Sequence, residues 1–231
     1  MTIPNGHGGT VPNPKPRTAE VFNVDPAVNS LAASVRDNED YLDTEYKGIE
    51  FTATKRFSRK WQMQAGFTIG KNTGGVSGGT DLNDPNNTRF PTGIIGNDSE
   101  TALRLSGSYI LPGQVTLAGS MLSNNGYPYT STYSLTRAAA ALQGITLTRA
   151  TQTITLSERG QERFPNVTMF DIRLSRPFRF GSRSFQPTVD FFNVGYADTT
   201  VNHTTTVGSS YLAPTEILSP RIIRVGFSLN F

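Results

Sequence analysis

The chain has 231 residues, a formal net charge of +3 and no cysteine. The absence of cysteine excludes disulfides, thiolate metal sites and cysteine nucleophiles, and the small net charge with interspersed signs gives no indication of nucleic-acid binding. Mean hydropathy is −0.33 and no run of about 18 apolar residues occurs, which excludes a helical membrane span but not a membrane β-barrel, where only alternate residues face lipid.

The first part of the chain is predicted to be irregular. Residues 1–45 are rich in Pro, Asn and Asp and lack sustained periodicity, so we expect a loop segment with at most one helical turn, within Val28–Val35. The first residues show neither the basic nor the apolar region of a signal peptide. We therefore expect either a cytoplasmic protein or a chain that has lost its original beginning.

Between residue 46 and the C-terminus, stretches of period-two alternation predict seven β-strands. In each stretch one row of side chains is apolar and the other is polar or small. The last apolar row is Ile223, Val225, Phe227, Leu229 and Phe231. The predicted strands are Lys47–Phe57, Trp61–Gly70, Thr101–Leu111, Gln114–Ser123, Thr168–Phe178, Phe185–Phe191 and Arg221–Phe231.

The connections between these strands alternate in length. Short turns are expected near 58–60, 112–113 and 179–183, and long irregular loops at 71–100, 124–167 and 194–220. Unstructured loops beyond about 12–15 residues are uncommon in ordinary domains. Here all the long ones lie on the same side of the hairpins, as in outer-membrane barrels with short periplasmic turns and long extracellular loops. Residues 1–45 then belong to the extracellular side.

The strand lengths and strand ends favour the same architecture. About 9–11 tilted residues cross a bilayer, and the predicted strands fit that span. Lys55 and Arg176 stand just before short turns, where a long basic side chain can extend to lipid headgroups. Pro187 removes a ladder hydrogen bond and predicts a local bulge. The turn ends carry an expected aromatic girdle of Phe57, Trp61, Tyr109, Phe178, Phe185 and Phe231.

We therefore predict an all-β fold: an antiparallel transmembrane β-barrel segment of about seven meandering strands that forms an open partial barrel. Its apolar rows would face outer-membrane lipid. A soluble all-β sandwich with the apolar rows in its core is the alternative that alternation alone does not reject. The rows expected to face the lumen include Glu50, Arg104, Arg173, Asp190 and Arg224.

Residues from about 40 to 231 also resemble the barrel of TonB-dependent outer-membrane receptors, and most of all the Oar-like class with a carboxypeptidase-regulatory-like N-terminal domain. No single piece is diagnostic, but the pieces occur in the right order. The similar stretches are Tyr46–Glu50, Thr54–Ser58, Trp61–Ala65, Asp81–Asn87, Arg159–Asn166, Asp190–Val194 and Ser219–Phe231.

The resemblance implies a 22-stranded barrel in the outer membrane of a Gram-negative-type bacterium, plugged by an N-terminal domain through which TonB delivers energy. This sequence departs from that pattern, because the plug, the TonB box and roughly the first fifteen strands are absent. Residues 46–231 would then be the C-terminal part of a barrel. The expected partners are outer-membrane lipid, the barrel-assembly machinery and the remaining barrel strands, with TonB acting only through the missing plug.

Two groups of residues are candidates for function. The closing apolar row Val225, Phe227, Leu229 and Phe231 resembles the terminal signal that the barrel-assembly machinery reads. Tyr127 and Tyr129 follow the fourth strand and could offer aromatic surface to a ligand, although aromatics near strand ends more often belong to an interface girdle.

Nothing in the sequence indicates catalysis, a cofactor or a metal. The only histidines, His7 and His203, lie far apart in polar stretches, and no Gly-x-Ser-x-Gly nucleophile elbow occurs. Asp81–Asn87 fails the EF-hand template at Pro85, so turn chemistry explains this acidic stretch better. We predict that the protein is not an enzyme and has no catalytic residue, cofactor or metal ligand.

The first functional hypothesis is therefore part of a TonB-dependent receptor whose intact form imports a siderophore, a glycan or another nutrient. A soluble all-β surface or adhesion protein is the second hypothesis, and a passive porin-like barrel is the third. A homo-oligomeric barrel that shares strands between chains also stays open.

Overall fold

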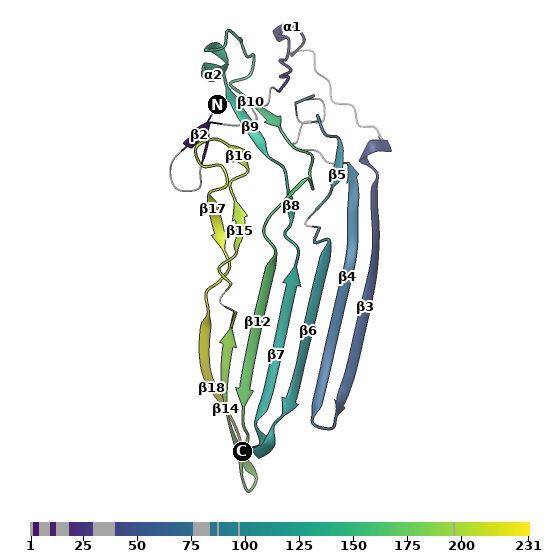
Figure 1. Ribbon diagram of the computed structural model, residues 1–231, viewed down its shortest axis with the longest axis vertical. Coiled ribbons are helices and arrows are strands. Elements are labelled where there is room, and N and C mark those ends of the chain that lie inside the picture. Colours follow the sequence, from purple (N-terminus) through teal and green to yellow (C-terminus); the bar gives the residue numbers. More distant parts are fainter. Residues whose placement is uncertain are drawn as a thin grey trace.

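A single antiparallel sheet dominates the computed structural model, which describes residues 2–4, 10–12, 19–29, 40–75, 84–86, 88–96, 98–195 and 197–231. Its long strands follow one another in chain order (Figure 1). They are β3 (Thr44–Ser58), β4 (Trp61–Gly75), β6 (Thr101–Ile110), β7 (Thr116–Asn124), β12 (Val167–Ser175), β14 (Arg183–Phe192) and β18 (Ile222–Asn230). The seven predicted strands and their meander are confirmed.

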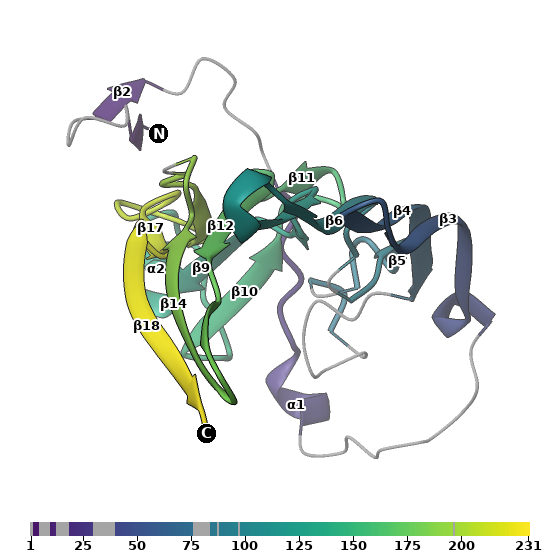
Figure 2. The ribbon, with the colours of Figure 1, turned by 90° about the horizontal axis from the view of Figure 1, so that it is seen from below.

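The sheet is open. Viewed from below in Figure 2, it follows an arc from β3 to β18 whose ends do not meet. Within the described residues β3 pairs only with β4, and β18 pairs only with β14. Because every neighbour in this odd-numbered meander is antiparallel, the two outermost strands run in the same direction.

The strand registers give the sheet two chemically different faces. Ala65 of β4 pairs with Leu105 of β6, which pairs with Met121 of β7, which pairs with Phe170 of β12. These residues belong to one continuous apolar face, whose other members include Ile49, Phe51, Phe67, Ile69, Leu117, Leu174, Val189, Ile223, Val225, Phe227 and Leu229. No second sheet covers this face in the described part of the chain, so most of its side chains are exposed and the rest are half-buried, none of them in a sandwich core.

The opposite, polar face holds an ion-pair cluster. Asp190 of β14 is only 4% exposed and pairs with Arg173 of β12 and with Arg224 of β18, the latter at 2.7 Å. Arg173 and Arg224 are half-exposed, so the cluster is accessible from the polar face. These contacts join three strands side by side.

The short turns all lie at one end of the sheet. Arg59 and Lys60 adopt positive φ angles of 51° and 71° in the β3–β4 turn, as a two-residue hairpin with the sheet's twist requires. Lys55 does not extend away from its strand; its Nζ donates to Ser58 Oγ at 2.7 Å and lies 4.2 Å from the centroid of the Trp61 ring. The side chain therefore stabilises its own turn.

The bulge predicted at Pro187 is wrong. β14 keeps an unbroken register with β18, in which Pro187 lies opposite Phe227. The carbonyl of Pro187 accepts a bond from the Arg176 amide, so the missing N–H faces the same neighbour. That neighbour is already interrupted, because β12 ends at Ser175 and the strand resumes only as β13 (Phe178–Phe180). Because β12 is already interrupted there, Pro187 removes no further hydrogen bond between the strands.

The long connections are not irregular, which corrects the sequence prediction. Residues 124–167 contain β8 (Pro128–Tyr129), β9 (Thr132–Thr136), α2 (Arg137–Ala141), β10 (Thr151–Thr155) and β11 (Glu162–Arg163). Residues 194–220 contain β15 (Thr200–His203), β16 (Thr206–Val207) and β17 (Pro214–Ile217). β9 pairs with β10, and β16 joins β9 in parallel. A further short strand, β5 (Thr92–Ile94), extends the pairing of β4.

The main buried hydrophobic cluster of the described residues lies in these loops and not in the sheet. Leu135, Ala140, Leu147 and Ile154 form it, and Ala19 and Val21 pack against it. Short elements elsewhere are β1 (Thr2–Pro4), β2 (Thr10–Pro12), α1 (Pro26–Asn29), η1 (Asp40–Leu42) and η2 (Pro112–Gln114). Helix α1 starts before the predicted turn at Val28–Val35, whose later residues lie outside the described ranges. No helix among the described residues is long and apolar enough to cross a membrane.

A buried polar group fastens the N-terminal segment to the loops. Asp84 accepts bonds from Arg149 Nη1 at 2.7 Å and from Gln152 Nε2 at 2.8 Å. Asn86 bonds both main-chain groups of Phe22, accepting from the amide at 2.9 Å and donating to the carbonyl at 2.7 Å. Asn86 also donates its amide to Asp84, as expected for turn chemistry. We call these five residues the loop clamp.

We expect the loop clamp to weaken in acid. Burial raises the pKa of Asp84, but hydrogen bonds from Gln152 and Asn86 and the charge of Arg149 outweigh burial and lower the pKa below its usual value. A depressed pKa stabilises the fold above the ordinary aspartate value of about 4, and this stabilisation is lost as the pH falls through the folded value. The exchange protection factor of the Phe22 amide should fall over that range. In the Asp84→Asn variant it should be lower at neutral pH and insensitive to acid; a wild-type factor that does not change would contradict the expectation.

Candidate ligand-binding site

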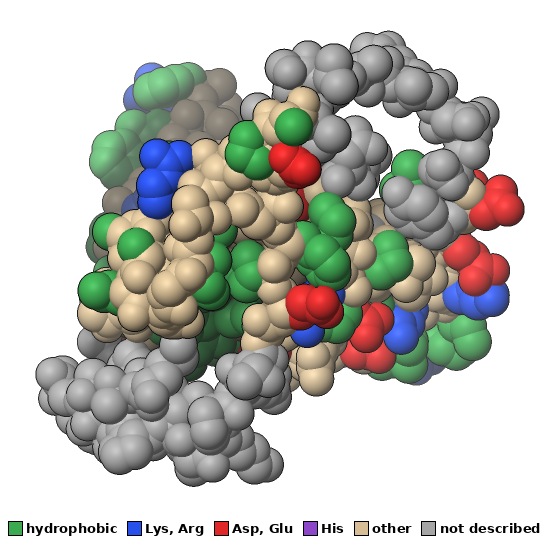
Figure 3. Space-filling view, turned by 90° about the horizontal axis from the view of Figure 1, so that it is seen from above, with side chains coloured by type: hydrophobic (Ala, Val, Ile, Leu, Met, Phe, Trp, Pro, Cys, Tyr) green, Lys and Arg blue, Asp and Glu red, His purple; other side chains and the backbone are tan. Residues whose placement is uncertain are grey.

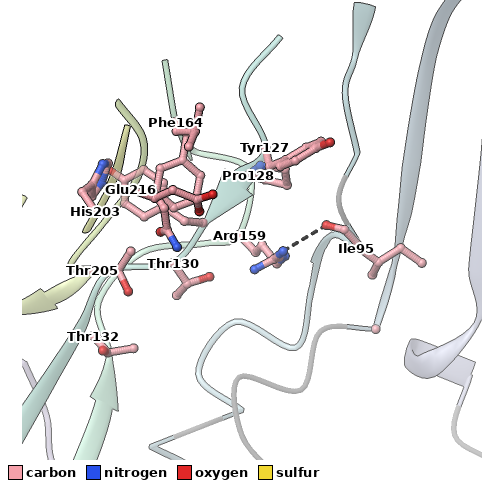
Figure 4. Close-up of a pocket in the computed structure, with 15 residues that line it drawn as sticks. Ile95, Tyr127, Pro128, Thr130, Thr132, Arg159, Phe164, His203, Thr205 and Glu216 are labelled. Atoms are coloured by element: carbon pink, nitrogen blue, oxygen red, sulfur yellow. Dashed lines mark hydrogen bonds between the residues drawn. The ribbon is translucent and has the colours of Figure 1, made fainter. Parts of the chain in front are cut away.

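A pocket of about 840 Å³ lies at the loop end of the sheet, opposite the short turns. Its walls come from β8, from the β15–β17 hairpin and from the segment that follows β5 (Figure 4). Seen from the loop end in Figure 3, side chains of both charge signs stand among uncharged ones. The surface there has no single dominant charge, so the chemistry of this pocket depends on individual residues.

One wall of the pocket is an aromatic cluster of Tyr129, Phe164 and His203. The ring centroids are 4.8 Å apart for Tyr129 and Phe164, 4.7 Å for Tyr129 and His203, and 4.6 Å for Phe164 and His203. The cluster joins β8 to β15, which are far apart in the chain. His203 Nε2 is buried and has no hydrogen-bond partner among the described residues. Burial lowers the pKa of His203, and the nearby charge of Glu162 only partly opposes this shift.

Behind the aromatic cluster lies a polar network around Glu162. Ser131 Oγ donates to the Glu162 carboxylate and is 2.7 Å from the hydroxyl oxygen of Tyr211. Ser157 Oγ donates to the same carboxylate at 3.0 Å. Burial, then the charge of Glu162 and the proximity of Tyr211, raise the pKa of Tyr129 to about 12. The Tyr129 hydroxyl therefore stays neutral at physiological pH.

Arg159 lies across the pocket from this cluster (Figure 4). Its Nη2 donates to the carbonyl of Gly96 at 2.9 Å, and its own carbonyl accepts from the Ile94 amide at 2.9 Å. Burial lowers the pKa of Arg159. No described residue forms an ion pair with this guanidinium, in contrast to Arg149, Arg163, Arg173 and Arg224, each of which has a carboxylate partner.

The structure places both predicted loop aromatics in this pocket. Tyr127 is 43% exposed, whereas Tyr129 is half-buried in the cluster. Arg159, Phe164 and His203 were not among the predicted site residues, and His203 was expected to be an isolated histidine. No local signal could have found them, because only the folding of the two long connections brings them together. A ligand-contact role for Tyr127 and Tyr129 stays a prediction.

The other predicted group lies at the opposite end of the molecule. Val225, Phe227 and Leu229 belong to the edge strand β18 and Phe231 follows it; these four residues are 76%, 69%, 50% and 90% exposed. Phe227 contacts Phe185 of β14, with ring centroids 5.8 Å apart. Recognition of this row by an assembly machinery stays a prediction.

Comparisons with known proteins give a weak likeness to solved structures. No protein-family model and no curated protein matches the sequence. Among solved structures, the chain is similar to the ferripyoverdine receptor of the outer membrane of Pseudomonas aeruginosa bound to ferripyoverdine, with 14% identity and a TM-score of 0.45. The match covers 80% of this chain and 19% of the receptor, so the chain spans about one fifth of that receptor's length.

Proposed function

We propose that the chain is the C-terminal part of a TonB-dependent outer-membrane receptor barrel whose intact form imports a nutrient ligand such as a siderophore or a glycan. The observation that carries the proposal is the continuous, exposed apolar face that extends over seven strands. Soluble monomers rarely expose contiguous apolar patches larger than a few hundred Å². Outer-membrane lipid covers such a face without cost, which supports this localisation.

The exposure of this face disfavours the soluble surface or adhesion protein. That alternative needs Val225, Phe227 and their neighbours in a core between two sheets. In the described residues these side chains are exposed, and the buried hydrophobic cluster belongs to the loops. The long-loop end carries the pocket, as expected if that end faces the outside and first meets the ligand.

The free edges of the sheet indicate what completes the barrel. Each unpaired backbone group in hydrocarbon costs several kcal/mol, so both edges need partner strands. β3 and β18 run in the same direction, so direct pairing of these edges in a ring of identical chains would be parallel. An all-antiparallel closure requires an odd number of additional strands between them. This geometry disfavours the homo-oligomer and fits further strands of the same receptor.

The membrane part of the proposal is tested by refolding the whole chain with and without phospholipid vesicles. We expect the chain to float with the vesicles and to aggregate when lipid is absent, whereas its two unpaired edges should keep it from forming a closed, protease-resistant barrel without partner strands. A soluble monomer that unfolds cooperatively without lipid or detergent would overturn the proposal.

The receptor part is tested on the DNA upstream of this reading frame. We expect it to encode a plug domain and an odd number of further alternating strands. An upstream region that encodes strands without a plug would instead support the passive porin-like barrel. Assembly and energy delivery follow from this arrangement: the barrel-assembly machinery would read the closing strand, and TonB would act through the plug.

A further inference from the structure

We infer that the pocket at the loop end is a subsite for a small molecule that carries a carboxylate group, with Arg159 as its anchor. The inference deepens the proposed function and rests on it for the role of the subsite in ligand capture.

The anchor, Arg159, is a cation without a counter-ion among the described residues. Arg159 is partly buried, and its guanidinium forms no ion pair with any described residue. The hydrogen bond from its Nη2 to Gly96 is exposed, so the charge is accessible to an anionic group of a ligand. The hydrogen bond from its Nη2 to the Gly96 carbonyl holds the guanidinium, and the bond from the Ile94 amide to the Arg159 carbonyl holds the backbone. A fixed guanidinium is well suited to a carboxylate, which it binds through two parallel hydrogen bonds.

The rest of the pocket suits an organic body attached to that carboxylate. Its volume of about 840 Å³ is in the range of small-molecule sites. Tyr127 presents an exposed ring to the pocket, and Phe164 and His203 line the wall beyond it. Hydroxyl groups of Thr130, Thr132 and Thr205 line the same space and provide hydrogen bonds. A planar or ring-containing ligand body can stack on such an aromatic wall.

The charges in the pocket favour a monocarboxylate over a phosphate. Arg159 contributes one positive charge, and partial burial of His203 lowers its pKa, which disfavours a second one. Glu216 of β17 lines the same pocket with a negative charge and would repel a doubly charged anion. Arg159 is the only Lys or Arg among the residues that line the pocket, so it can neutralise one carboxylate.

The test compares two probes of nearly equal shape, para-fluorobenzoate and its uncharged amide para-fluorobenzamide. Binding of each probe to the full chain in detergent micelles is followed by fluorine NMR line broadening, with empty micelles as the blank. We expect the wild type to bind the acid at least about tenfold more tightly than the amide, the size expected for charge-assisted hydrogen bonds. Equal binding of the two probes, or no binding of the acid, would overturn the inference.

Three variants locate the site. Arg159→Gln should weaken binding of the acid about tenfold or more and leave the amide unchanged. Tyr127→Ala keeps the guanidinium and should weaken both probes, which provides a second measurement if Arg159→Gln misfolds. Arg183→Gln, at the opposite end of the sheet, is the matched control and should bind like the wild type. Wild-type affinity in Arg159→Gln would contradict the assignment.

The experiment separates this inference from the proposed function. A chain that enters vesicles but does not distinguish the two probes overturns only the subsite. A chain that stays in water yet binds the acid through Arg159 overturns only the membrane receptor.

Discussion

Leu105→Arg is expected to abolish most of the chain's partition into phospholipid vesicles. Leu105 lies near the middle of β6 on the apolar face, between Ala65 and Met121 on the neighbouring strands. An arginine facing lipid near the bilayer midplane costs about 2–4 kcal/mol, which corresponds to a partition constant lower by a factor of roughly 30 to 1,000. Flotation of the refolded chain with vesicles, over a series of lipid concentrations, measures this constant.

Ser106→Arg is the matched control. Ser106 is the next residue of the same strand and points to the polar face, and both residues are exposed in the structure. In water, an arginine at either exposed position would change stability by at most about 0.5 kcal/mol. Only lipid on one face distinguishes the two positions. Equal partition of the two variants would show that the apolar face does not contact lipid.

Gly126→Ala is expected to open the loop end of the molecule while the sheet persists. A Cβ atom on Gly126 would overlap the carbonyl oxygen of Phe164, which is main chain and has no rotamer by which to move away. The Gly126 amide bonds Asn166 Oδ1 at 3.1 Å, and the Tyr127 carbonyl accepts from the Phe164 amide at 2.9 Å. Overpacking costs typically about 1–3 kcal/mol, and a clash with main chain belongs at the upper end of that range.

Limited proteolysis with trypsin, which cleaves after arginine, measures the effect. The Arg163–Phe164 peptide bond becomes accessible only when the contact between Gly126 and Phe164 opens. Arg163 is otherwise held by Asp98, at 3.1 Å, and by the Gly126 carbonyl. Gly208→Ala is the control: a Cβ there meets nothing within 4 Å, and the backbone does not need a positive φ. Its stability should change by less than about 0.5 kcal/mol. Similar cleavage in both variants would contradict the expected clash.

Local alternation was sufficient to predict the sheet. The row that contains Val225 and Phe227 is apolar in the sequence and exposed in the structure, and the short turns and long connections lie where the pattern places them. Alternation could not predict the register, and so could not show that Pro187 faces an interruption of β12 instead of a bulge. It also could not show that Lys55 stabilises its own turn, because that depends on the bond to Ser58.

The loops were predicted least well, because their strands are short and their partners are distant. β9 and β10 lie in a stretch rich in threonine and alanine that carries no strong period. Phe22 and Asn86 are 64 positions apart in the chain, and Asn23 bonds the Thr146 carbonyl across 123 positions. Sequence patterns that extend over ten residues contain no information about such contacts.

The sequence by itself determined the strands, their two faces and the one-sided distribution of the loops, because side chains alternate along a strand whatever its surroundings. The predicted open sheet is confirmed, and only the tertiary structure decided the registers of its strands, since these follow from the pairing of all of them. It also decided that Tyr127, Tyr129, Arg159 and His203 share one pocket. Their meeting depends on the contact between the connections 124–167 and 194–220, which the parallel pairing of β9 with β16 also shows.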